Sequence, residues 1–477
     1  MIYAIIITYL VLTFLSGFIG YKKAQNTPED YFLASRNIGS IVLFFTFIAT
    51  NFSAFFFLGF AGQGYKVGYS YFAMMSLGTA IASLAFYLIG YKTWKLGKEH
   101  GFITTTEMIG NISGSKSLQW LYLIITLVFT LPYMALQPMG AGYILNELTK
   151  GFISYEAGAI LLTAFIVIYV CIGGMRSVAI TDLKQGILMF IFMALAFYLI
   201  SDTHGGFINA NENVFNIKPS LFQLNGPGAA YSPQKWFSLM LLWLFCVPMF
   251  PQMMMRYFIS KDLSSLKTAS LLYATIPLIL FLFPVAIGVM GHLSFPESSA
   301  INADKILPMM LMKHTPEWLA ALILTGAMAA FMSTLDSQLL SVSTLLTRDV
   351  YVKYIDPNAS LKKQVRVGKV LIVIIAVLGL MIAFNAPDSI FDFAKQTFTG
   401  FAIMFPVIFA LLHIKGIPNT AYITALIVGQ TLFAGFYMEW IPQSLCLGFE
   451  IIIPIMIVTC LILSIGYFIK SFNILSK

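Results

Sequence analysis

The chain has 477 residues, of which 59% are hydrophobic and only 10% are charged. This composition excludes an ordinary soluble globular protein and indicates an integral membrane protein. The formal net charge of +8 comes from basic residues that are scattered over many loops, so it does not indicate a nucleic-acid partner.

Apolar stretches long enough to cross ~30 Å of hydrocarbon, about 20 residues each, recur along the whole chain. Most of the 28 Lys and Arg fall in alternate loops, which predicts an outside N-terminus and a cytoplasmic C-terminus. We expect the membrane to be a bacterial plasma membrane. We predict thirteen spans, at residues 2–20, 39–62, 68–91, 117–146, 153–173, 179–201, 234–257, 268–292, 316–346, 366–384, 389–413, 417–437 and 446–469.

Two of these spans are interrupted. The second contains ATNFSAFFFLGFAGQG, with polar residues at its middle and three glycines beyond, and the seventh contains CVPMFPQMMMRYF, with two prolines. Unwound backbone at membrane depth is tolerated where it lines a cavity or binds a ligand, and a matched pair of broken helices is typical of an inverted-repeat transporter. Two unrelated kinks are the alternative, because Pro and Gly are common in membrane helices.

If the first span is set aside, the breaks open two successive sets of five spans. This predicts an all-α protein with an inverted five-plus-five repeat. Its segments are an extra N-terminal helix and loop at 1–38, the first repeat at 39–201, an extracellular loop at 202–233, the second repeat at 234–413 and two C-terminal helices at 414–477.

The span at 316–346 carries a polar face. Ala330, Ser333, Thr334 and Ser337 are spaced i, i+3, i+4 and i+7, and their oxygens are the hard ligands that suit sodium. Hydroxyls that only join helices, at ~0.6 kcal/mol each, are the alternative. Asp336 lies on the same span, where a carboxylate costs roughly 2.5–3.5 kcal/mol and usually marks an ion or proton pathway.

The chain resembles the sodium/solute symporters, a family that includes sodium-coupled proline, pantothenate, monocarboxylate, sialic acid and sugar transporters. The matching stretches are EDYFLASRNIG at 29–39, ATNFSAFFFLGFAGQGYKVGYSY at 49–71, GGMRSVAITDLKQG at 173–186 and AAFMSTLDSQLLSVSTLLTRDVY at 329–351. The resemblance implies the same fold, with one extra helix in front of the repeat and two behind it.

The resemblance also implies a sodium site. Its ligands would be the carbonyls of Ala49, Phe52 and Ala330 and the hydroxyls of Ser333 and Thr334. Some members bind a further sodium one turn deeper, at positions that match Asp182, Asp336 and Ser337; this chain departs from the family at Asp336, where an acid replaces a neutral ligand.

Two explanations of Asp336 remain open. Asp336 and Asp182 could form an accessory site for sodium or a proton, so that one or two cations are used. Alternatively, Asp336 could pair with Arg176 or Lys184 and latch the inner gate.

The substrate is expected beside the two breaks, in a cavity that is mostly apolar with a few polar groups. We expect no Lys or Arg in these central stretches, so an anionic substrate would rely on amides or helix N-termini. The residues expected to line the site are Asn51, Phe55, Phe56, Tyr71, Tyr133, Gln137, Trp243, Pro251 and Gln252.

We therefore expect a monomeric, sodium-coupled symporter that imports a small organic acid or an amino-acid-like solute. The alternatives are proton or mixed coupling through Asp336 and Asp182, a sugar or sialic acid substrate, a channel, or a transporter-like sensor. An enzyme is not expected, because the chain has neither an HExxH nor a GxSxG motif.

Overall fold

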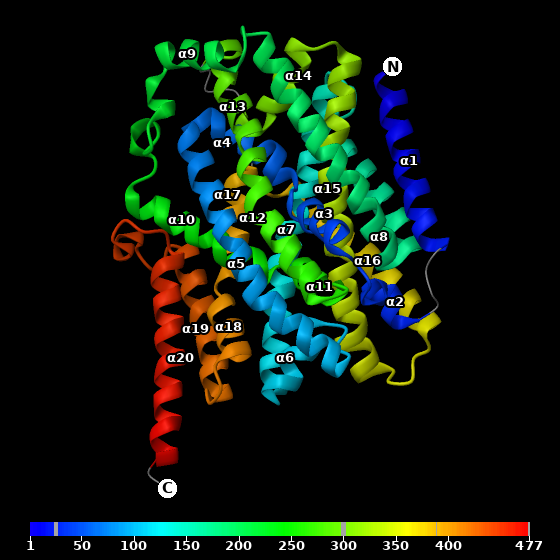
Figure 1. Cartoon of the computed structure of the whole chain (residues 1–477), viewed down its shortest axis with the longest axis vertical. Helices are drawn as coiled ribbons and strands as arrows, with labels where there is room; N and C mark the ends of the chain where they lie inside the picture. The colour runs from blue at the N-terminus through cyan, green and yellow to red at the C-terminus, as the bar shows by residue number, and fades with distance from the viewer. Residues whose placement is uncertain (23–26, 297–301, 388, 476–477) are drawn as a thin grey trace.

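The computed structural model describes residues 1–22, 27–296, 302–387 and 389–475. Within these ranges all regular elements are helical, and the two termini lie at opposite ends of the molecule (Figure 1). The helices of the first half are α1 (Ile2–Lys22), α2 (Pro28–Leu33), α3 (Ser40–Asn51), α4 (Phe60–Val67), α5 (Tyr69–His100), α6 (Thr105–Ser113), α7 (Lys116–Leu148), α8 (Tyr155–Asp202) and α9 (Phe207–Ile217).

The second half repeats this helical character. Its helices are α10 (Pro233–Cys246), α11 (Pro251–Ile259), α12 (Leu263–Leu280), α13 (Leu282–Ser294), α14 (Ile306–His314), α15 (Glu317–Leu345), α16 (Leu361–Phe384), α17 (Ile390–Ala402), α18 (Phe405–His413), α19 (Asn419–Tyr437) and α20 (Ile452–Leu475). Single turns join several of them, including a π-helical segment at Phe55–Gly59 and a 3-10 turn at Ala303–Lys305.

The number of spans agrees with the sequence. Within the described ranges, ten helices are long and apolar enough to cross a membrane, and two bent pairs bring the total to twelve. Helix α8 has 48 residues and would be about 70 Å long if straight, more than twice the hydrocarbon thickness. Because it bends at Gly174, where φ is +63°, it contains two spans, and thirteen result.

The two predicted breaks are present. α3 and the helix that follows it meet at 66°, and the segment that ends at Met249 meets α11 at 55°. The first break lies at Phe52–Ala54, before the glycines. Gly64 instead allows α4 to lie against α13, because a Cβ there would stand 2.2 Å from the carbonyl oxygen of Val285. The close packing of these two helices, and not a break in the helix, explains why a glycine stands at this position.

Local signals in the sequence start the long helices. Ser115 caps α7 by accepting the N–H of Leu118 at 3.2 Å, and Asp262 caps α12 by accepting the N–H of Ser265 at 2.7 Å. The chain between 202 and 233, expected to be a loop, contains the eleven-residue helix α9. The expected short helix near Ala303–Met312 is present as the 3-10 turn and α14.

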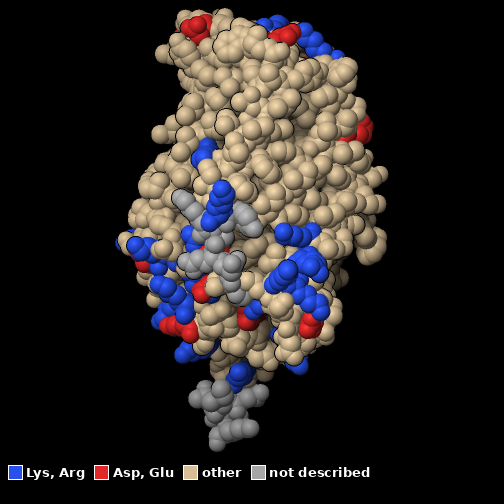
Figure 2. Space-filling view, turned by 90° about the vertical axis from the view of Figure 1, so that its right-hand side faces the viewer, with Lys and Arg blue, Asp and Glu red and all other residues tan. Residues whose placement is uncertain are grey.

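Helix α15 is the centre of the molecule. Every residue from Ile323 to Leu345 is buried, and α15 packs against α1, α3, α7, α8, α11 and α16. Figure 2 shows Lys and Arg gathered over the lower part of one face, below a broad uncharged surface. This asymmetry matches the loop charges; the orientation of the termini in the membrane stays a prediction.

Candidate functional site

The first break is held open by side chains. The Ser53 hydroxyl accepts the N–H of Phe55 at 3.2 Å, and the Gln137 carbonyl oxygen, from α7, accepts the N–H of Ala54 at 3.1 Å. Both backbone donors would have been paired within an unbroken helix. Gln137, which we expected to face the substrate, therefore supports the unwound backbone.

One turn of α15 faces the carbonyls at this break. The Thr334 hydroxyl oxygen lies 3.4 Å from the Ala49 carbonyl oxygen and 3.5 Å from that of Phe52. These separations are long for hydroxyl hydrogen bonds, which are usually ~2.7–2.8 Å. Two oxygens at right angles around one hard cation, each ~2.4 Å from it, would stand about 3.4 Å apart. We call Ala49, Phe52 and Thr334 the upper layer.

The other two expected sodium ligands are placed differently. Ala330 is buried one helical turn before Thr334, on the same face of α15. The Ser333 hydroxyl donates to Asp182 Oδ1 at 2.5 Å. Ser333 thus contacts the carboxylate of the candidate second site, and no contact joins it to the carbonyls of Ala49 or Phe52 among the described hydrogen bonds.

A second cluster lies beside the first, and a guanidinium group is at its centre. Arg256 Nη2 lies 3.0 Å from Asp182 Oδ2 and 2.5 Å from the Ser337 hydroxyl oxygen. The Thr50 hydroxyl lies 3.5 Å from Asp182 Oδ2 and 3.2 Å from Ser337. The side chains of Arg256 and Asp182 are both 0% exposed. We call Thr50, Asp182, Arg256, Ser333 and Ser337 the lower layer.

Asp336 borders the lower layer and is also fully buried. Its Oδ2 accepts the Tyr169 hydroxyl at 2.5 Å, and its Oδ1 accepts the Ser337 hydroxyl at 3.1 Å. Neither basic partner that we considered is in place: Arg176 pairs with Asp30, and Lys184 donates to the Ser16 hydroxyl at 2.9 Å. The alternative of a latch from Asp336 to Arg176 or Lys184 is not present in this structure, because these two cations have partners on α2 and α1.

Sequence reasoning missed Arg256. The predicted span 234–257 contains Arg256, which lies on α11, but no role is predicted for it from the sequence. A useful signal was available: CVPMFPQMMMRYF surrounds this arginine with apolar residues, and two carboxylates elsewhere in the spans lacked a cation. Thr50 and Tyr169 were missed too, because isolated hydroxyls in apolar helices carry little signal.

A small cavity lies beside the upper layer. Its volume is about 30 Å³, far below the ~300–1,000 Å³ of ordinary ligand pockets, so the protein is closed around it. Five expected substrate residues line it, namely Asn51, Phe55, Phe56, Tyr133 and Trp243, with Phe52, Phe60, Met75, Thr79, Val247, Phe250, Phe281 and Phe398.

The remaining expected substrate residues surround this cavity without lining it. The ring of Tyr71 packs edge-on against Phe60 and Phe391, and Pro251 begins α11. Gln252 is 0% exposed. Among the described residues, neither polar atom of the Gln252 amide has a hydrogen-bond partner, nor do Trp243 Nε1 and the Tyr71 hydroxyl. Buried polar groups left unpaired in this way usually have a function or a missing partner.

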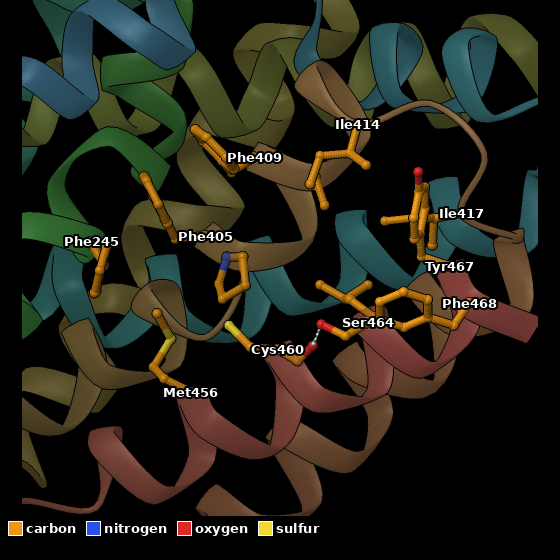
Figure 3. Close-up of a pocket in the computed structure, with 13 residues that line it drawn as sticks. Phe245, Phe405, Phe409, Ile414, Ile417, Met456, Cys460, Ser464, Tyr467 and Phe468 are labelled. Carbon is orange, nitrogen blue, oxygen red and sulfur yellow. Dashed lines mark hydrogen bonds between the residues drawn. The ribbon is translucent and has the colours of Figure 1, made fainter. Parts of the chain in front are cut away.

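A larger cavity, of about 430 Å³, lies elsewhere, between α10, α18 and α20 (Figure 3). Phe245, Phe405, Phe409 and Tyr467 are among its lining residues, and its only hydroxyl besides that of Tyr467, on Ser464, already donates to the Cys460 carbonyl at 2.9 Å. None of the residues that line this apolar cavity belongs to the upper or the lower layer. Its size therefore does not make it the candidate site.

Comparison with known proteins supports this view of the fold. The chain is 28% identical over 469 residues to the sodium/pantothenate symporter of Escherichia coli, covering 97% of this chain and 95% of that protein. It is 27% identical to an osmoregulated proline transporter of Bacillus subtilis, covering 92% of this chain and 88% of that one.

Solved structures show the same architecture. A Na⁺-coupled sialic acid symporter in a substrate-bound, outward-open state matches with a TM-score of 0.80 at 19% identity, covering 98% of this chain and 97% of that one. Mhp1, a nucleobase-cation-symport-1 family transporter, matches with a TM-score of 0.61 at 14% identity, covering 92% and 95%. These identities establish the fold only.

A family model described as the sodium:solute symporter family matches residues 31–429, most of the chain. The matched range includes both broken helices and α15. The members of this family are membrane transporters and not enzymes. The protein belongs to the sodium:solute symporter family.

Proposed function

We propose that the protein is a sodium-coupled symporter that imports a small polar organic solute by alternating access. The observation that carries this proposal is the upper layer: a hydroxyl of α15 faces two carbonyls of a broken helix at 3.4 and 3.5 Å, a spacing that suits ligands of a shared ion. Sodium is here a transported substrate, with the carbonyl of Ala330 as a further candidate ligand.

The layer joins two parts that must move relative to one another in alternating access. Ala49 lies in the last turn of α3 and Phe52 at the break, whereas Thr334 belongs to the central helix α15. An ion shared by these oxygens favours the conformation in which the two helices are close. Loss of sodium to a low-sodium cytoplasm then allows them to separate.

The substrate is proposed to bind in the small cavity once its aromatic walls have moved apart. Trp243 Nε1 and the Gln252 amide are buried polar groups that could recognise it, and the described lining residues include no Lys, Arg, Asp or Glu. This favours an organic acid or an amino-acid-like solute that is bound through neutral donors. Relatives named pantothenate and proline symporters support that class, whereas the sialic acid symporter keeps a sugar acid as an alternative.

Uptake into proteoliposomes tests the proposal. Radiolabelled pantothenate, proline and monocarboxylates are compared with and without an inward sodium gradient. Thr334→Ala is expected to raise the sodium concentration for half-maximal uptake at least tenfold, about 1.4 kcal/mol. Thr344→Ala is the matched control, because the Thr344 hydroxyl donates to Leu340 within its own helix at 2.6 Å. Sodium-independent uptake of every accepted substrate would contradict sodium coupling.

A second candidate is proton coupling through Asp336. The short contact between Asp336 and the Tyr169 hydroxyl favours it, since no cationic side chain pairs with Asp336 among the described ion pairs. Asp336→Asn in counterflow assays is expected to abolish any pH dependence of transport. Asp356→Asn is the control, because that residue pairs with Lys363 and belongs to neither layer. Unchanged pH dependence and sodium stoichiometry in Asp336→Asn would exclude this role.

A further inference from the structure

Arg256 is held in an unusual position for an arginine. It lies on the nine-residue helix α11, which begins immediately after the second break, and its side chain is 0% exposed. Arg256 Nη1 lies 3.3 Å from the Gln252 carbonyl oxygen, so the guanidinium is fixed from its own helix. Arg256 Nη2 bridges α8 and α15 through Asp182 and Ser337.

We propose that the Arg256 guanidinium is a tethered cation that takes the place of a second transported ion. This inference rests on the proposed sodium symport, and it fixes the stoichiometry at one sodium for each substrate. The candidate second site of Asp182, Asp336 and Ser337 is thereby served by a charge that belongs to the protein and that never crosses the membrane.

The geometry explains why both cations cannot share this position. A sodium ion bound to Asp182 Oδ2 and to the Ser337 hydroxyl would need to lie ~2.4 Å from each oxygen. Arg256 Nη2 already lies 3.0 Å and 2.5 Å from the same two atoms. The other Asp182 oxygen accepts the Ser333 hydroxyl at 2.5 Å, so both carboxylate oxygens are engaged.

The charges lead to the same conclusion. Removing two opposite charges from water is costly, and a buried pair persists where hydrogen bonds satisfy the remaining atoms. Asp182 has that support, from Arg256, Ser333 and Thr50. An added sodium would place a second positive charge beside the guanidinium, at a distance where the repulsion between them is poorly screened.

The contact between Arg256 and Asp182 also links the position of α11 to the opening and closing of the site. α11 is one half of the second broken helix, and Arg256 connects it to two helices that lie next to the upper layer. If α11 moves away when the site opens, Asp182 loses its cation. Because the guanidinium cannot diffuse away, it returns to Asp182 when the site closes, which favours the closed arrangement without using the ion gradient.

The experiment measures sodium stoichiometry in proteoliposomes, from the ratio of ²²Na⁺ to radiolabelled substrate uptake and from the Hill coefficient for sodium. The wild type is expected to give a ratio of one. Arg256→Gln frees the carboxylate of Asp182 and is expected to raise the ratio towards two. Arg256→Lys keeps a tethered charge and is expected to stay at one.

Arg176→Gln is the matched control, because Arg176 pairs with Asp30 and not with Asp182. Its ratio should remain one. Should Arg256→Gln fail to fold, the double variant Arg256→Gln with Asp182→Asn removes both charges together; it is expected to transport with a ratio of one.

The outcomes separate this inference from the proposed function. A wild-type ratio of two, or a ratio of one in an active Arg256→Gln variant, overturns the tethered cation and leaves sodium coupling intact. Uptake that does not depend on sodium in the wild type overturns the proposed function itself.

Discussion

The two layers of oxygens on α15 use similar residues in opposite ways. In the upper layer, Thr334 faces two carbonyls at separations too long for good hydrogen bonds. In the lower layer, Asp182 accepts the Ser333 hydroxyl at 2.5 Å and pairs with Arg256 at 3.0 Å. The first spacing suits ligands of the proposed sodium ion, whereas the carboxylate of the second already has a cationic partner in Arg256.

Under the proposals above, one turn of α15 serves both a transported ion and a cation that belongs to the protein. Ser333 and Thr334 are neighbours in the sequence, yet their side chains serve different layers. Removing a residue of the lower layer should therefore change stability first. Removing one of the upper layer should change sodium affinity first.

The largest effect is expected for Arg256→Leu. Asp182 would remain buried without its cation, which typically costs about 3–5 kcal/mol. Thermal unfolding in detergent, at fixed protein and sodium concentrations, should show a clear fall in Tm, with partial recovery when Asp182→Asn is added. Lys363→Leu is the control, since its pair with Asp356 is partly exposed, at 54% and 26%. An equal fall in Tm for Arg256→Leu and Lys363→Leu would mean that burial of the Arg256 pair does not contribute to stability.

The next effect concerns the backbone that forms the upper layer. Gln137→Leu leaves the N–H of Ala54 without its acceptor and is expected to cost about 2 kcal/mol, within the usual range for a buried unsatisfied donor. Sodium affinity should fall as well, because the break positions the two carbonyls. Gln430→Leu, which loses a bond to the Gly400 carbonyl away from the break, should leave sodium affinity unchanged. A normal sodium response in Gln137→Leu would disprove this support.

Ser333→Ala decides to which layer Ser333 belongs. If its hydroxyl serves Asp182, the variant loses about 1.5 kcal/mol of stability, the lower end for a hydrogen bond to a charged group. Its sodium affinity should then fall less than that of Thr334→Ala. Paired measurements of Tm and of sodium-dependent uptake in both variants provide the check, and a larger loss of affinity in Ser333→Ala would return Ser333 to the sodium site.

The smallest expected effect is on the pH dependence of stability. It tests how a carboxyl group that is buried without an ion pair contributes to that dependence. Asp304, in the turn before α14, accepts the N–H of Ile390 at 2.7 Å but has no ion pair among the described residues. Burial raises the pKa of Asp304 from 3.8 to about 6, although that N–H and Lys66 lower it and Asp392 raises it.

The sign of the effect follows from linkage. Between pH 4 and pH 6 the folded protein holds a proton on Asp304 that the unfolded chain releases, so stability rises as the pH falls through about 6. Tm measured against pH should show this slope in the wild type and lose it in Asp304→Asn. Asp262 is the control: the N–H of Ser265 lowers its pKa, so its contribution is lost as the pH falls. Identical slopes in wild type and Asp304→Asn would contradict the assignment.

Much of this protein could be predicted from its sequence. Apolar length identified the spans, Pro248 and Pro251 marked the second break, and the spacing of Ala330, Ser333 and Thr334 placed them on one helical face. These are local properties, since they depend on residues within one or two helical turns of each other.

Only the tertiary structure decided which charges meet. Arg256 reaches Asp182 from 74 positions away, and Tyr169 reaches Asp336 from 167 positions away. An arginine near the end of an apolar stretch can reach either water or a buried carboxylate. The local sequence around the arginine is the same in both cases. The packing of α11 against α15 and α3 removes Arg256 from water, and the carboxylate that it meets there decides its partner.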